Sequence, residues 1–170
     1  MRSSRSNLVV FYAQCQWSWA PPLAGYEHRP TDAQMAQYFA AGGKTWTGAS
    51  TNTIHWCGLF SLYVLRLAGV ACSWNGSIVP VGGQLVQHPM PSNIKQFPGV
   101  HIGDVVVRKD DTGNEHYIII AQEVPPGRHS NNIWAIDGNS TGMPTDPRVR
   151  FSNFWKHTTA RFLYWWSVES

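Results

Sequence analysis

Side chains that together can hydrolyse an amide bond follow one another along this sequence of 170 residues. Cys57 comes first, His116 follows, and Asp137 and Asn139 flank a glycine further on. A thiolate that attacks an amide needs a base that also protonates the departing amine, and imidazole suits both steps near neutral pH. Asp137 is expected to orient the imidazole, while Asn139 supplies a second orienting contact or a contact to a substrate amide. Each residue alone is more often structural, but their order predicts a cysteine hydrolase.

The residues around Cys57 predict an amphipathic helix. Gly69 is expected to end this helix, and Asn52 or Thr53 to cap its start. Cys57 would then lie in or beside the first turn, where unpaired N–H groups and the helix dipole favour a thiolate. His55 is a candidate substrate-binding group or oxyanion donor, and an exposed loop residue is an equally good interpretation. The buried face is predicted from apolar residues at helical spacing, which are Trp56, Leu59, Phe60, Tyr63, Val64 and Leu67.

The remaining pattern predicts one α+β catalytic domain over residues 1–170. Residues 31–41 predict a further helix that is opened by Thr31 or Asp32 and ended by two glycines. The segment 73–99, rich in Gly, Pro and Asn, predicts a long irregular loop, and such loops are more often functional than idle. Helical signals in the first half and closely spaced strand signals in the second are typical of an α+β fold. The strands of an expected antiparallel meander are residues 105–107, 116–121, 133–136 and 162–166.

Composition and charge narrow the class of function. The chain is 43% hydrophobic and 13% aromatic, which is enough to build a core, and its formal net charge is +3. Its lysines and arginines are scattered rather than clustered, which argues against nucleic acid as a partner. No run approaches the ~20 apolar residues that cross a bilayer, and the apolar stretch 8–13 is too short for a secretion signal. We therefore expect a protein made in the cytoplasm without a cleaved signal and without stable membrane insertion.

Cysteine and histidine usage argues against a metal site. Cys57 and His55 have no second close pair of ligands, and the other histidines are dispersed. Cys15 and Cys72 could pair in an oxidising compartment, or they could be small buried apolar residues. No metal and no cofactor are expected.

Four segments of the chain resemble the CHAP and NlpC/P60 papain-like amidases, over roughly residues 45–140. The Trp56-Cys57 pair and the aromatic-rich helix after it resemble the nucleophile helix of these families. The other three resemblances are Gly103-Asp104 before a hydrophobic strand, His116 before a run of isoleucines, and Asp137-Gly138-Asn139. The chain departs from the family pattern at Tyr117, where a small aliphatic residue is common, and at Asp137, where Glu is more frequent.

The resemblance implies a papain-like fold, in which the nucleophile helix packs on a small antiparallel sheet. It also implies hydrolysis of amide bonds in bacterial peptidoglycan. Cys57 would be the nucleophile and its backbone N–H an oxyanion donor, His116 the general base and acid, Asp137 the orienting residue and Asn139 a supporting residue.

The expected setting is an antibacterial effector toxin that a secretion system delivers to the periplasm or cell wall of a target bacterium. Such a toxin implies a cognate immunity protein as a second partner. The alternatives are a phage endolysin with the same chemistry, a cysteine protease or acyl transferase with another substrate, and a binding module without enzymatic activity.

Overall fold

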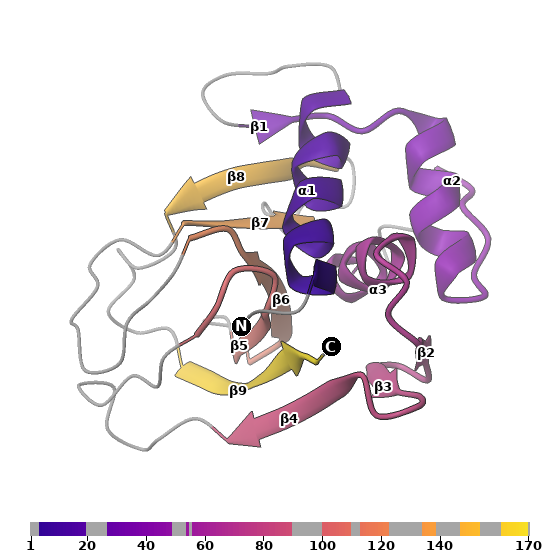
Figure 1. Ribbon diagram of the computed structural model, residues 1–170. Helices are drawn as coiled ribbons and strands as arrows, with labels where there is room; N and C mark the ends of the chain where they lie inside the picture. The colour runs from indigo at the N-terminus through magenta and orange to yellow at the C-terminus, as the bar shows by residue number, and fades with distance from the viewer. Residues whose placement is uncertain are drawn as a thin grey trace.

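Three helices lie beside an antiparallel sheet in the computed structural model, which describes residues 4–19, 27–48, 54, 56–89, 100–109, 113–122, 134–138, 147–153 and 161–169 (Figure 1). Helix α1 (Ser4–Trp19) and helix α3 (Cys57–Leu67) contact strands of the sheet. Helix α2 (Asp32–Ala41) packs on α3. The predicted α+β class is therefore confirmed.

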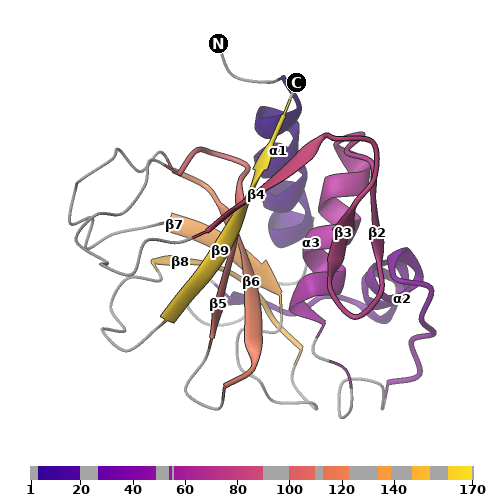
Figure 2. The same cartoon turned by 90° about the horizontal axis from the view of Figure 1, so that it is seen from below.

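Seven of the described strands form one sheet, in the order β1-β8-β7-β6-β5-β9-β4, and each neighbouring pair is antiparallel. The consecutive strands β5 to β8 form a meander. Strand β9 pairs with the other side of β5, and β4 pairs with β9. Strands β2 and β3 form a separate hairpin that contacts α3 through β2 and runs alongside it in Figure 2. The bounds are β1 Glu27–His28, β2 Cys72–Trp74, β3 Ile78–Pro80, β4 Leu85–Pro89, β5 Val105–Lys109, β6 Glu115–Ile120, β7 Trp134–Gly138, β8 Val149–Asn153 and β9 Arg161–Val168.

Local sequence explains where the helices begin and end. Thr31 forms a capping box at the start of α2, because its hydroxyl accepts the Gln34 N–H and its own N–H donates to the Gln34 side chain. Helix α3 begins at Cys57 with Trp56 at the N-cap, so the prediction that Asn52 or Thr53 caps it is wrong, and both residues lie outside the described part of the chain. The helix ends before Gly69, whose φ of +75° suits the expected glycine.

Helix α1 was not expected from the sequence, since its apolar residues do not follow one clear face. Val9 and Ala13 are buried in the core, but Leu8 and Phe11 are exposed. The apolar stretch 8–13 thus belongs to a helix that packs on the fold. None of the described helices combines the length and apolar character that a membrane span requires.

Gly103 shows why a Gly-Asp pair precedes strand β5. Its φ is +86°, and a Cβ at this position would lie 2.2 Å from the backbone oxygen of Ser6 in α1. Only glycine combines this backbone conformation with so close an approach. Asp104, the next residue, is buried and accepts the backbone N–H of His101 at 2.9 Å.

The segment 73–99 is more ordered than the predicted irregular loop. Its described part contains most of the β2–β3 hairpin and all of β4, and residues 90–99 lie outside the described residues. The strands escaped prediction because they are short, and Gly76 and Gly82 separate them in conformations with positive φ. The hairpin matters because Trp74 reaches the start of α3.

Candidate active site

Cys57 is the first residue of α3 and is 2% exposed. The first hydrogen bond of the helix runs from the Phe60 N–H to the Trp56 carbonyl at 2.9 Å, so the helix itself does not use the N–H groups of Cys57 and Gly58. Trp56 is fully buried and stacks on Tyr38, with ring centroids 6.0 Å apart. The buried indole thereby anchors the start of α3, where Cys57 is the first residue of the helix.

His116 and Asp137 form a buried hydrogen bond between neighbouring strands. His116 is the second residue of β6, and its Nε2 lies 2.5 Å from Oδ2 of Asp137 on β7. The pairing of Ile119 with Ile136 makes His116 and Asp137 diagonal neighbours on one face of the sheet. Asp137 and Gly138 are therefore both part of strand β7 and do not form a turn.

A cation on the next strand supports the buried carboxylate. Arg150 on β8 lies directly opposite Asp137, and its Nε is 3.7 Å from Oδ1. Asp137 has no solvent exposure, and a buried carboxylate is stable as an anion only when it is paired. His116 and Arg150 flank the carboxylate from the strands on either side.

The electrostatic environment favours a protonated His116. Burial lowers the pKa of His116, but the charge of Cys57, hydrogen bonds with Asp137 and Cys57, and the charge of Asp137 raise it from 6.5 to about 9. The structure thus brings Cys57, His116 and Asp137 into one interacting chain. At neutral pH this chain can hold an imidazolium beside the sulfur.

Cys57 and His116 interact near the end of strand β6 and not across the helix-covered face of the sheet. A Cβ on Gly58 would lie 3.4 Å from the Tyr117 ring, and one on Gly138 would lie 2.4 Å from the Trp56 ring, so Tyr117 and Gly138 face α3. Because side chains alternate along a strand, His116 and Asp137 point to the opposite face. The sulfur of Cys57 lies 3.8 Å from the backbone oxygen of Glu115, at the first residue of β6.

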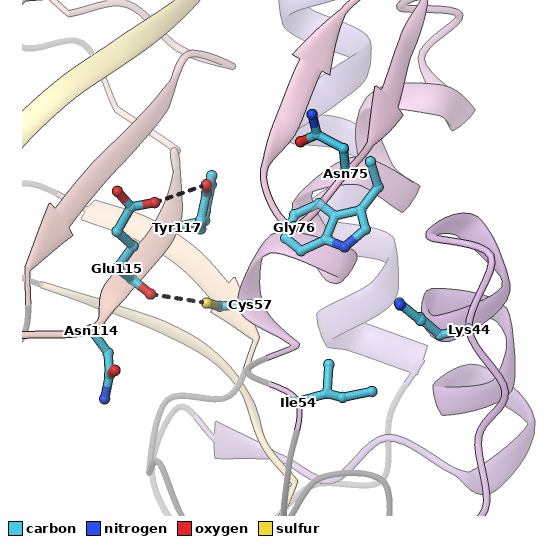
Figure 3. Close-up of a pocket in the computed structure, with 9 residues that line it drawn as sticks. Lys44, Ile54, Cys57, Asn75, Gly76, Asn114, Glu115 and Tyr117 are labelled. Atoms are coloured by element: carbon cyan, nitrogen blue, oxygen red, sulfur yellow. Dashed lines mark hydrogen bonds between the residues drawn. The ribbon is translucent and has the colours of Figure 1, made fainter.

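A cavity of about 470 Å³ opens beside Cys57 (Figure 3). Cys57 lines this cavity, whereas His116 and Asp137 are not among the described residues that line it. The Trp74 ring forms one wall and covers Gly58 so closely that a Cβ there would lie 2.4 Å from it. The described residues that line the cavity are Lys44, Ile54, Cys57, Trp74, Asn75, Gly76, Asn114, Glu115 and Tyr117.

The other predicted residues fall into two groups. His55 and Asn139 lie outside the described residues. Cys15 and Cys72 are free thiols, as is Cys57. Burial raises the pKa of Cys72 to about 11 although Arg66 lowers it, so this thiol stays protonated near neutral pH.

Sequence reasoning missed the charged residues around the thiol. Lys44 follows the end of α2, Glu115 immediately precedes His116, and Arg150 lies on the unpredicted strand β8. Only the adjacency of Glu115 to His116 could have drawn attention to one of them. Trp74 lines the cavity, whereas Trp46, Trp56 and Trp134 pack on other aromatic rings.

Within the described residues, no three His, Cys, Asp or Glu side chains cluster as metal ligands would. Comparison of the chain with family models, with curated proteins and with solved structures finds no match.

Proposed function

We propose that this protein is a cysteine amidase or endopeptidase that hydrolyses amide bonds of bacterial peptidoglycan. The observation that carries the proposal is the chain of interactions from the thiol of Cys57 to His116 and on to the buried Asp137, at the start of a helix and beside an open cavity. A nucleophile, its base and an orienting carboxylate in this order are the parts of a cysteine hydrolase.

The proposed first step is attack of the Cys57 thiolate on the carbonyl carbon of the scissile amide. The developing oxyanion accepts hydrogen bonds from N–H groups at the start of α3, and such donors are worth about 2.7–4 kcal/mol. His116, held as an imidazolium by Asp137, gives its proton to the departing amine as the C–N bond breaks. An acyl group then remains on the sulfur.

The second step hydrolyses the thioester and regenerates the Cys57 thiolate. Neutral His116 takes a proton from a water molecule, whose oxygen attacks the thioester carbon. The C–S bond breaks, the substrate carboxylate leaves, and the proton on His116 restores the starting pair. Asp137 holds the imidazole ring through Nε2 in both steps.

The proposed family is that of the CHAP and NlpC/P60 amidases, with a papain-like fold. The helix that begins at the cysteine, the histidine early in one strand and the carboxylate late in the next support this assignment. Asn139 would add a supporting contact and His55 a contact to substrate. Peptidoglycan as substrate rests on the resemblance of the motifs, and the open cavity gives space for a peptide beside the thiol.

Digestion of purified peptidoglycan, followed by mass spectrometry of the soluble fragments, tests this function. Each cut should add one water to the fragments and reveal which amide is broken. Cys57→Ala should lower the rate by about 10⁴-fold or more, because the proposed acyl intermediate forms on the Cys57 sulfur. Cys15→Ser and Cys72→Ala serve as controls that should keep activity in the folded protein. Substantial wall degradation by folded Cys57→Ala would remove the cysteine-hydrolase proposal.

The proposed setting is an effector toxin that acts in the periplasm of a target cell and is blocked by an immunity protein. Its substrate lies outside the cytoplasm, so the site of delivery should decide toxicity. Expression with an added periplasmic signal should lyse cells, whereas cytoplasmic expression and periplasmic Cys57→Ala should not. Equal toxicity from both compartments would contradict this setting.

A further inference from the structure

The cavity beside Cys57 carries opposite charges on its two sides. Glu115 comes from the start of β6, and Lys44 comes from the segment after α2. Figure 3 shows these two side chains on either side of Cys57. Glu115, Lys44 and Cys57 therefore line one cavity, with the two charges supplied by different elements.

Two tyrosines hold the carboxylate of Glu115 in place. The Tyr117 hydroxyl donates to Oε2 of Glu115 at 3.2 Å, and the Tyr164 hydroxyl donates to the same oxygen at 3.5 Å. Burial, together with the charge of Glu115, raises the pKa of both tyrosines, so both hydroxyls remain donors. No described residue donates to Oε1, which leaves this oxygen for a donor of the ligand.

Neither charge is neutralised by an ion pair with a described residue. Lys109 lies opposite Glu115 in the β5–β6 register, yet no ion pair joins the two side chains in the described structure. Lys44 is exposed and forms no ion pair with any described residue either. Trp74 and Tyr117 line the same cavity and offer aromatic surface to a cation.

We propose that the cavity is a two-sided charge site, in which Glu115 binds a primary amine of the substrate and Lys44 binds a carboxylate on the opposite side of the scissile bond. The substrate class is then a peptide that carries a free amino group and a free carboxylate near the amide that is cut. This inference rests on the proposed function for its hydrolytic step, but the charge site itself can be tested without hydrolysis.

Charged thiol reagents measure the charge site directly. Methanethiosulfonates convert a thiolate into a mixed disulfide and release a sulfinate, and they exist with aminoethyl, sulfonatoethyl and neutral methyl groups. Peptide mapping of the full chain gives the rate at Cys57 for each reagent. Relative to the neutral reagent, Glu115→Gln should slow the aminoethyl reagent and Lys44→Gln the sulfonatoethyl reagent, each by about three- to fivefold.

Matched control variants distinguish an effect of the two cavity charges from an effect of the net charge of the protein. Glu169→Gln and Arg29→Gln remove exposed charges that do not line the cavity, and neither should change the reagent preference. Unchanged preferences in Glu115→Gln and Lys44→Gln, or equal changes in the controls, would overturn the charge site.

Acetylated peptidoglycan extends the test to the substrate. Blocking the free amines of the wall with acetic anhydride should slow hydrolysis by the wild-type protein. Glu115→Gln should hydrolyse the untreated wall more slowly and should be insensitive to acetylation. If acetylation slows wild type and Glu115→Gln equally, Glu115 does not bind the amine of the substrate. That outcome would not contradict the proposed hydrolase activity. If no wall is hydrolysed but the reagent preferences hold, the peptidoglycan proposal fails and the charge site stands.

Discussion

Nε2 of His116 and Oδ2 of Asp137 lie 2.5 Å apart in a buried hydrogen bond that joins strands β6 and β7. The bond fixes the ring through one nitrogen, which leaves Nδ1 for the thiol at the end of the strand. Asp137 also contacts Arg150 through its second carboxylate oxygen, Oδ1. Four elements therefore meet at this one carboxylate and its imidazole: α3, β6, β7 and β8.

Asp137→Asn is expected to lower peptidoglycan turnover by about 10²-fold to 10⁴-fold, because the amide cannot stabilise the imidazolium. Asn139→Ala should cost less, since it removes a neutral contact. Turnover and thermal unfolding should be measured on the same samples. If Asp137→Asn unfolds early but turns over normally while folded, another residue must orient His116.

The raised pKa of His116 predicts how stability depends on pH. The folded-state pKa of about 9 lies above the ordinary value of 6.5, so the proton on His116 stabilises the fold fully below 6.5. This stabilisation is lost as the pH rises through about 9. The melting temperature of wild type relative to His116→Gln should therefore be highest in acid and should fall across this range. A constant difference across the same range would contradict the raised pKa.

Arg150 should act as a positioning residue through Asp137. Arg150→Met leaves the buried carboxylate with His116 alone, so turnover should fall by about fivefold to tenfold. The fall should lie in kcat rather than in KM, because Arg150 is not among the described residues that line the cavity. Arg150→Lys should restore part of the lost turnover. A lower melting temperature with unchanged turnover in the folded protein would assign Arg150 a purely structural role.

Two glycines next to the site should respond differently to alanine. A Cβ on Gly138 would lie 2.4 Å from Trp56 and 2.9 Å from Phe60, both inside the core. Gly138→Ala should therefore lower the free energy of unfolding by about 1–3 kcal/mol. A Cβ on Gly58 would meet Trp74, which lines the open cavity and can move. Gly58→Ala should therefore lower the free energy of unfolding less than Gly138→Ala does, but it should slow turnover. Calorimetry measures the stability of both variants, and a wall-digestion assay measures their turnover.

Local patterns in the sequence were sufficient to predict several helices and strands and the order of the candidate residues. Apolar spacing located α3, with Cys57 at its start, and runs of β-branched residues located most of β5, β6 and β7. A capping pattern at Thr31 located α2. These features are readable because they depend on neighbours within a few positions of the chain.

The residues that surround the thiol are brought together by long-range contacts of the fold. Tyr164 reaches Glu115 because β9 returns to pair with β5, and Arg150 reaches Asp137 because β8 pairs with β7. Trp74 covers Gly58 because a short hairpin lies against α3. None of these pairings leaves a periodic signal, since strand register and loop closure depend on contacts between residues far apart in sequence. The charges and walls of the cavity therefore follow from the fold and not from any local pattern.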